Sequence, residues 1–269
     1  MRKEFVMEVI KSYNQYYGKY FENAVCAAIN GERAANLTGF DFPAEDIAAM
    51  NADAALCAEA INGDSAEWVG NHTSTMDCDA IIDGVHTEIK YTSNGNGTYY
   101  NTSMTYFDKF GFTPYKGYME KEVYPYLEQF FGPISRAKTS PVSMKESKDF
   151  RHNHPAEYKT LTALDKAART KYVAELYDFL NANPAVLAQF VSEMVNKTPA
   201  GKSIPQQLVV FNYTTKNCSV INANDISALS GPAALENKGL SLRYGNLRFA
   251  FSWQNGTALN NPTIRVFID

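Results

Sequence analysis

The chain has 269 residues, of which 45% are hydrophobic, 20% charged and 13% aromatic, and this composition excludes collagen-like, low-complexity and disordered classes. The net charge of −4 is uneven: residues 1–108 carry 6 Lys and Arg against 16 Asp and Glu (−10), residues 109–171 carry 12 against 7 (+5), and residues 172–269 carry 7 against 6 (+1). An acidic front and a basic middle suit a cation site beside a polyanion-binding surface, although a solvated face gives the same pattern.

No apolar run reaches the roughly 18 residues of a membrane helix, so the sequence predicts a soluble protein with no membrane partner. The first residues carry acids within their apolar stretch and lack a small-residue cleavage site, which argues against a secretory signal and predicts a cytoplasmic location. The four cysteines form no CxxC pair, which argues against zinc ribbons and redox dithiols. We expect reduced, buried thiols at Cys26, Cys57, Cys78 and Cys218.

Two helices come first in the predicted order, over residues 4–29 and 44–61, and each ends at an Asn-Gly pair. Residues 75–92 then change to period-two alternation around a turn dipeptide, which predicts a β-hairpin. Residues 93–118 are rich in Asn, Gly, Thr and Tyr and are expected to form a polar loop region with short strands.

The second half of the chain is predicted to be helical and then β. Residues 119–131 and 157–197 are expected to be mostly helical, the latter broken near Asn181–Pro184, with a basic Ser- and Pro-containing connection over residues 132–156. Four strands are expected after that, at Gln207–Tyr213, Leu240–Tyr244, Arg248–Trp253 and Thr263–Ile268. The simplest organisation is one α/β domain over residues 1–269 with an inserted helical and basic region at about 119–200.

The predicted hairpin contains most of the candidate catalytic residues. Asp83-Gly84 is a favoured two-residue hairpin loop, and it fixes a register in which Ile82 opposes Val85, Ala80 opposes Thr87 and Asp79 opposes Glu88. Alternation then sorts the side chains onto two faces. The apolar face receives Cys78, Ala80, Ile82, Val85, Thr87 and Ile89, and the other receives Asp77, Asp79, Ile81, His86, Glu88 and Lys90.

Two carboxylates opposite each other in a sheet repel, because their Cβ atoms are roughly 4.5–5.5 Å apart. A divalent cation removes this repulsion, and hard oxygen ligands suit Mg²⁺, with Mn²⁺ as a substitute. Lys90 shares the face of Glu88 and can meet an anion held by the metal. An exposed acidic hairpin paired by Lys90 is the alternative interpretation.

Asp79, the Glu88-Ile89-Lys90 tripeptide and the hairpin between them resemble the PD-(D/E)XK nuclease superfamily, whose best-known members are type II restriction endonucleases. The proline that precedes the family's aspartate is replaced here by Cys78. The segment Tyr17–Val25 also resembles the family's opening helix. The resemblance covers roughly residues 17–93.

The resemblance implies a restriction-endonuclease-like α/β core, with a mixed central β-sheet flanked by helices and helical insertions. It also implies roles for five residues: Asp79 and Glu88 as metal ligands, the carbonyl of Ile89 as a third, Lys90 orienting the attacking water or stabilising the developing phosphorane charge, and Glu22 as an outer or second-metal ligand. A homodimer acting on double-stranded DNA is implied by the two-fold symmetry of typical targets.

Two further regions are candidate DNA contacts. The polar loop after the hairpin offers donors at Ser93, Asn94 and Asn101, although a plain flexible loop explains it equally well. The basic stretch, with Lys138, Lys145, Lys148 and Arg151, is the best candidate for gripping phosphates. Together these features predict a Mg²⁺-dependent, sequence-specific endodeoxyribonuclease. The alternatives are a structure-selective or repair nuclease of the same core, and a non-catalytic nucleic-acid- or carbohydrate-binding module.

Overall fold

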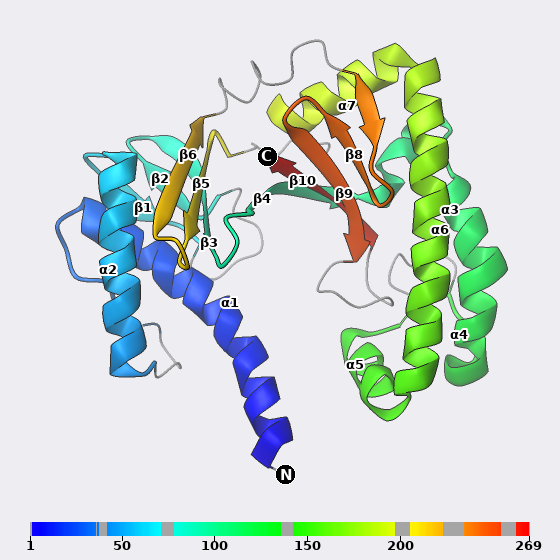
Figure 1. The fold of residues 1–269 in the computed structure, drawn as a ribbon, viewed down its shortest axis with the longest axis horizontal. Coiled ribbons are helices and arrows are strands. Elements are labelled where there is room, and N and C mark those ends of the chain that lie inside the picture. The colour runs from blue at the N-terminus through cyan, green and yellow to red at the C-terminus, as the bar shows by residue number, and fades with distance from the viewer. Residues whose placement is uncertain are drawn as a thin grey trace. The chain divides into compact units, whose positions relative to one another are not determined.

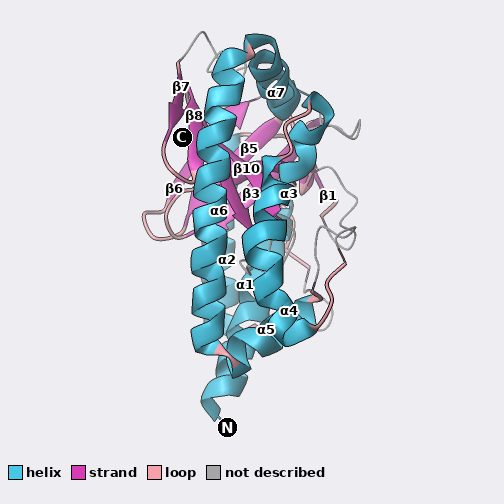
Figure 2. Cartoon of the chain, turned by 90° about the vertical axis from the view of Figure 1, so that its right-hand side faces the viewer, coloured by secondary structure: helices cyan, strands magenta, loops and turns pink. Residues whose placement is uncertain are grey.

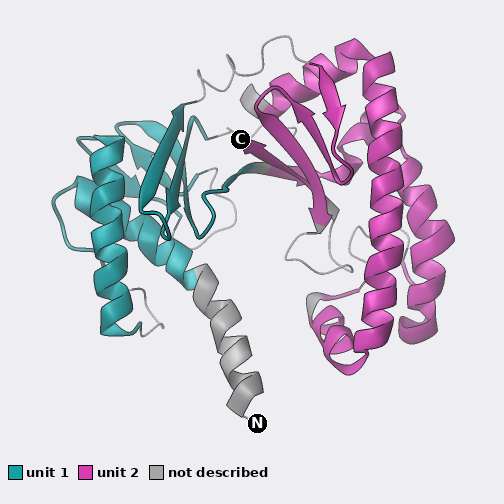
Figure 3. Cartoon of the chain, in the orientation of Figure 1, with its two compact units in different colours: residues 1–99, 195–228 teal, residues 100–194, 229–269 magenta. Residues whose placement is uncertain are grey.

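A computed structural model describes residues 2–35, 37, 42–70, 78–135, 142–196, 205–222, 234–253 and 262–268. The chain forms two compact units, each built from two separate stretches of sequence (Figures 1 and 3). Unit 1 comprises residues 1–99 and 195–228, and unit 2 comprises residues 100–194 and 229–269.

Unit 1 begins with the two predicted helices, α1 (Arg2–Ile29) and α2 (Ala44–Ile61). The predicted stop of α2 is confirmed: Asn62 adopts the left-handed conformation, with φ of 55°, and its N–H donates to the carbonyl of Ala58. The exposed face of α2 is rich in alanine, whereas its buried face contributes Met50, Ala54 and Cys57 to the core.

The sheet of unit 1 is mixed and has the strand order β1-β2-β3-β5-β6. Strands β3 and β5 pair in parallel, and the other three pairings are antiparallel. The five strands are β1 (Ala66–Trp68), β2 (Ala80–Ile82), β3 (Val85–Thr92), β5 (Gln207–Asn212) and β6 (Asn217–Asn222). One face packs against α1 and α2 in a core that includes Phe21, Val25, Ile89 and Phe211. Strands β1 and β6 were not predicted.

Unit 2 combines a second five-stranded sheet, of order β4-β10-β9-β8-β7, with most of the helices. Its strands are β4 (Thr98–Ser103), β7 (Leu235–Asn237), β8 (Ser241–Tyr244), β9 (Leu247–Trp253) and β10 (Pro262–Ile268). The long helix α6 (Pro155–Ala182) runs beside α3 (Pro114–Tyr118), as Figure 2 shows, and α7 (Pro184–Asn196) follows the predicted break. Strands β8, β9 and β10 were predicted, and β7 was not.

Two predicted connections are in fact structured. The supposed loop region 93–118 contains β4, a 3-10 helix (Met104–Phe110) and α3. The basic connection contains α5 (Met144–Asn153), which begins with a capping box between Ser143 and Glu146. The predicted helix at 119–131 is confirmed as one turn of π-helix (Met119–Val123) followed by α4 (Tyr124–Phe131).

Most of the region predicted as an insertion, about residues 119–200, shares unit 2 with the C-terminal strands, and only its end from residue 195 belongs to unit 1. The physical reason is direct packing. The guanidinium of Arg169 on α6 donates to the carbonyl of Phe251 on β9 at 2.6 Å. The rings of Phe190 on α7 and Phe249 on β9 are in contact, with their centroids 4.7 Å apart. The mixed sheet flanked by helices is thus present in unit 1, while membership of one nuclease domain stays a prediction.

Three of the four cysteines are buried free thiols, as predicted, and Cys218 is partly exposed. The sulfur atoms of Cys57 and Cys218 lie 3.5 Å apart, between α2 and β6. None of the helices in the described part of the chain combines the length and apolarity that crossing a membrane requires.

Replacing Gly18 by alanine is expected to stabilise the protein by about 0.5–1 kcal/mol, because glycine is unfavourable inside a helix. Gly18 lies within α1, and a Cβ added there meets no heavy atom within 4 Å. Urea unfolding at equilibrium measures the change. A destabilised Gly18→Ala protein would contradict the open environment described for this position.

Candidate active site

The hairpin turn has the predicted geometry. Asp83 and Gly84 both have positive φ, of 50° and 79°, as a two-residue turn of this type requires. The resulting register pairs Ile82 with Val85 and Ala80 with Thr87, as predicted. The turn therefore sets which face of the sheet each following side chain joins.

The two faces of the hairpin also divide as predicted. Ala80, Ile82, Thr87 and Ile89 are at most 3% exposed, and the three apolar ones belong to the core beneath α1 and α2. The opposite face of β3 presents His86, Glu88 and Lys90 in succession. The apolar face thus anchors the hairpin in the core, and the polar face carries the candidate catalytic side chains.

Asp79 lies just outside the regular ladder, which ends at the Ala80–Thr87 pair. The N–H of Asp79 donates at 3.0 Å to the carbonyl of Thr87, the residue already opposite Ala80, so the predicted strict pairing of Asp79 with Glu88 is not continued. The Asp79 carboxylate instead accepts a hydrogen bond from the main-chain N–H of Ile89 at 2.9 Å. This bond fixes the carboxylate beside β3.

Lys90 bridges the two predicted carboxylates. Its Nζ lies 3.2 Å from Oδ2 of Asp79 and forms an ion pair and hydrogen bond with Oε1 of Glu88. Asp79 and Glu88 are therefore on the same side of the sheet, as the register predicted. Burial lowers the pKa of Lys90, but the adjacent charges of Asp79 and Glu88 outweigh it and hold that pKa above its usual range, so the ammonium stays charged.

Glu22 joins this cluster from α1. It is only 9% exposed, and its Oε2 accepts a long hydrogen bond of 3.4 Å from the indole N–H of Trp68. Burial and the neighbouring charge of Asp79 raise the pKa of Glu22 to about 8. Burial likewise raises the pKa of Glu88 to about 7, against the opposing influence of Lys90. Three carboxylates thus share one ammonium, which leaves the fully ionised cluster with two negative charges in excess.

The donor set of this cluster fits Mg²⁺ or Mn²⁺, which prefer carboxylate and carbonyl oxygens. The main-chain N–H of Ile89 points to Asp79, and the carbonyl of a strand residue faces the same edge as its N–H, so the Ile89 carbonyl lies at that edge too. Within the described ranges, no group of three or more His, Cys, Asp and Glu side chains is arranged ready to hold a metal. The Lys90 ammonium stands between Asp79 and Glu88 instead.

The candidate DNA-binding residues are divided between the two units. Ser93 and Asn94 are exposed in unit 1, and the Asn94 side chain accepts the N–H of Asn96 in a local turn. Asn101 on β4 and three cations of α5 are exposed in unit 2: Lys145, Lys148 and Arg151. Lys138 and Asp77 lie outside the described residues. Among the predicted site residues that lie in the described ranges, those brought together are Glu22, Asp79, Glu88, Ile89 and Lys90.

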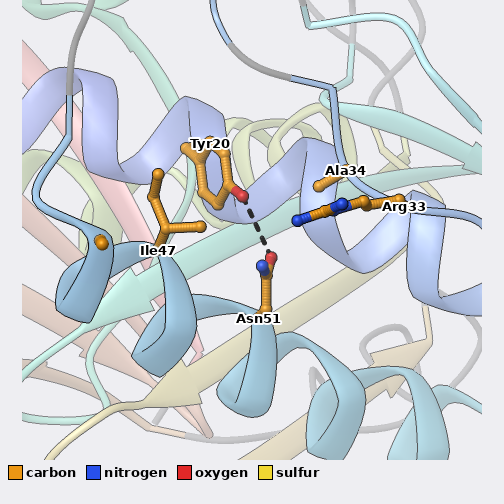
Figure 4. A pocket seen from close by; sticks show the side chains of 6 residues that line it. Tyr20, Arg33, Ala34, Ile47 and Asn51 are labelled. Carbon is orange, nitrogen blue, oxygen red and sulfur yellow. Dashed lines mark hydrogen bonds between the residues drawn. The ribbon is translucent and has the colours of Figure 1, made fainter.

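One cavity in unit 1 is separate from this cluster. It has a volume of about 500 Å³ and is lined by Tyr20, Arg33, Ala34, Ala44, Ile47 and Asn51 (Figure 4). Tyr20 donates to Asn51 at 3.2 Å, and it stands two positions before Glu22 on α1. Residues two apart on a helix point about 200° apart, so the cavity and the carboxylate cluster lie on different sides of α1.

In EDTA, the melting temperature is expected to fall as the pH rises from about 5 to about 9. The pKa of buried Glu22 is raised in the folded state, so its contribution to stability is full below the ordinary carboxyl pKa and is lost as the pH rises through about 8. Because burial also raises the pKa of Glu88, this residue contributes a further loss of stability as the pH rises. The Glu22→Gln variant should show a shallower decline, and a decline equal to that of the wild type would contradict the burial of a titrating Glu22.

Comparison with known proteins does not identify the chain, since it matches neither a protein-family model nor a curated protein.

Proposed function

We propose that the protein is a metal-dependent endodeoxyribonuclease that hydrolyses phosphodiester bonds in double-stranded DNA, with a PD-(D/E)XK active site in unit 1. The observation that carries this proposal is the convergence of Glu22, Asp79 and Glu88 around Lys90 at one end of a hairpin. If the hairpin were only an exposed acidic surface paired by Lys90, these groups would be open to solvent. Instead Glu22 is 9% exposed, and the side chains of Asp79, Glu88 and Lys90 are 19%, 21% and 27% exposed.

In this proposal Asp79, Glu88 and the Ile89 carbonyl hold the cation, and Glu22 completes the set as an outer or second-metal ligand. A bound Mg²⁺, or Mn²⁺ in its place, lowers the pKa of a coordinated water and neutralises charge on the scissile phosphate. A cation among three carboxylates also offsets the excess of negative charge in the cluster. The two remaining tasks, orienting the water and stabilising the developing charge, fall to the protein.

Lys90 performs these tasks as an ammonium. In the cluster without a cation, burial lowers the pKa of Lys90, and the charges of Asp79 and Glu88 outweigh burial and hold that pKa above its usual range. With a cation held by Asp79 and Glu88, the Lys90 ammonium would be free to donate hydrogen bonds to the attacking water or the phosphate. A fixed positive charge there is most favourable where negative charge grows in the transition state.

The proposal extends to the partners of the protein. Exposed Lys145, Lys148 and Arg151 on α5 supply a salt-dependent contribution to DNA binding, and Ser93, Asn94 and Asn101 contribute polar contacts. Cleavage of both strands at one site calls for two active sites, so we propose a homodimer that acts as a site-specific restriction-type enzyme. The location proposed for it is the cytoplasm.

Incubation of supercoiled plasmid with the protein and Mg²⁺, with EDTA as the parallel reaction, tests this function. Discrete linear fragments in Mg²⁺ and intact plasmid in EDTA are expected. Cutting confined to branched or damaged DNA would replace sequence specificity with structure selectivity. Absence of cleavage with Mg²⁺ or Mn²⁺, by protein that still binds DNA, would overturn the enzymatic proposal in favour of a binding module.

A further inference from the structure

The segment Trp68–Gly70, at the end of β1, contacts two of the proposed metal-site carboxylate residues. The N–H groups of Val69 and Gly70 both donate to the main-chain carbonyl of Asp79, at 3.1 and 2.9 Å. The indole N–H of Trp68 donates to Oε2 of Glu22 at 3.4 Å. Three consecutive residues therefore connect Glu22 on α1 to the backbone of Asp79.

Gly70 occupies the space between these two acids. A Cβ added to Gly70 would lie 3.0 Å from Oε2 of Glu22, 3.2 Å from the carbonyl oxygen of Asp79 and 3.3 Å from its Cα. Two of these three atoms belong to the backbone, which cannot rotate aside as a side chain can. A residue larger than glycine would thus push Glu22 and Asp79 apart.

We propose that Trp68 and Gly70 are positioning residues that set the orientation of the Glu22 carboxylate and its separation from Asp79, and thereby the affinity of the site for a divalent cation. The proposal rests on the proposed metal-dependent function. The indole N–H of Trp68 donates to Oε2 of Glu22, and this hydrogen bond restrains the orientation of the carboxylate. Groups that orient a metal-ligating side chain change metal affinity by about 10–100-fold when they are removed.

Titration with Mn²⁺ alone tests the proposal, with bound metal measured from the loss of the electron paramagnetic resonance signal of free Mn²⁺. The Trp68→Phe variant, which keeps a smaller aromatic ring and loses the indole N–H, should bind Mn²⁺ about 10-fold more weakly than the wild type. Gly70→Ala should weaken binding by at least as much, and Glu22→Gln should also weaken it. Quenching of tryptophan emission by Mn²⁺ gives a second readout, since Trp68 is one of only two tryptophans.

Gly63→Ala is the matched control, because it crowds the opposite end of the same hairpin: its Cβ would lie 2.8 Å from Cγ2 of Ile82 and 3.2 Å from Oδ2 of Asp83. It should lower the melting temperature and leave Mn²⁺ affinity within about 2-fold of the wild type. If Trp68→Phe binds Mn²⁺ as the wild type does while Glu22→Gln binds it weakly, the positioning role is overturned and the metal site stands. If the wild type binds no Mn²⁺, both proposals fail.

Discussion

Replacement of Lys90 by alanine is expected to reduce the rate of plasmid cleavage by about 10²–10³-fold at saturating Mg²⁺, the loss typical when one preorganised group that stabilises a transition state is removed. The ammonium lies beside both Asp79 and Glu88, and no other described lysine or arginine is ion-paired with either carboxylate. Lys90→Arg should restore only part of the rate, because a planar guanidinium differs in shape from an ammonium. Initial rates of supercoiled-plasmid loss measure the effect.

A lysine outside the cluster provides the control for this loss. Lys238 forms a surface ion pair with Glu236 in unit 2, and both side chains are more than half exposed. Lys238→Ala should therefore cleave within about 2-fold of the wild-type rate, since such pairs contribute little. Equal rates of plasmid cleavage by Lys90→Ala and the wild type would show that Lys90 is not part of the active site.

Replacement of Asp79 by asparagine is expected to abolish both cleavage and the stabilisation of the protein by Mg²⁺. At a Mg²⁺ concentration 100 times its dissociation constant, a bound cation stabilises the folded state by about 2.7 kcal/mol. The wild type should therefore melt at a higher temperature in Mg²⁺ than in EDTA, and the Asp79→Asn variant should melt at the same temperature in both. Calorimetry in the two buffers measures this difference.

The same variant tests the electrostatics of the cluster without metal. Asparagine keeps an oxygen that can accept the Ile89 N–H, and it removes one of the charges that raise the pKa of Glu22. We expect Asp79→Asn to be at least as stable as the wild type in EDTA at about pH 8. Marked destabilisation would mean that the ion pair of Asp79 with Lys90 outweighs the repulsion among the carboxylates.

The hairpin could be predicted from the sequence because its determinants are local. Asp83-Gly84 fixes the turn, the turn fixes the register, and alternation then places Glu88 and Lys90 on one face. The same holds for α1 and α2, whose ends are marked by Asn-Gly pairs. The position of Glu22 near Asp79 came only from a family resemblance, since it depends on how α1 packs against the sheet.

The parts that were not predicted depend on contacts distant in sequence. Strand β1 has three residues and pairs only at one edge, so it gives too short a pattern to detect. Strand β6 alternates polar and apolar residues only over residues 217–220, which is too short a run to stand out. Pairing by Lys90 entered only the alternative interpretation, an exposed acidic hairpin. The favoured interpretation left the two carboxylates uncompensated, whereas the Lys90 ammonium pairs with both of them.

Anomalous diffraction from crystals equilibrated with Mn²⁺ shows whether Asp79 and Glu88 hold a divalent cation. We expect a manganese peak at coordination distance from both carboxylates, with the Lys90 ammonium displaced from between them. A saturated crystal in which Lys90 still bridges the two acids and no peak lies beside them would contradict it.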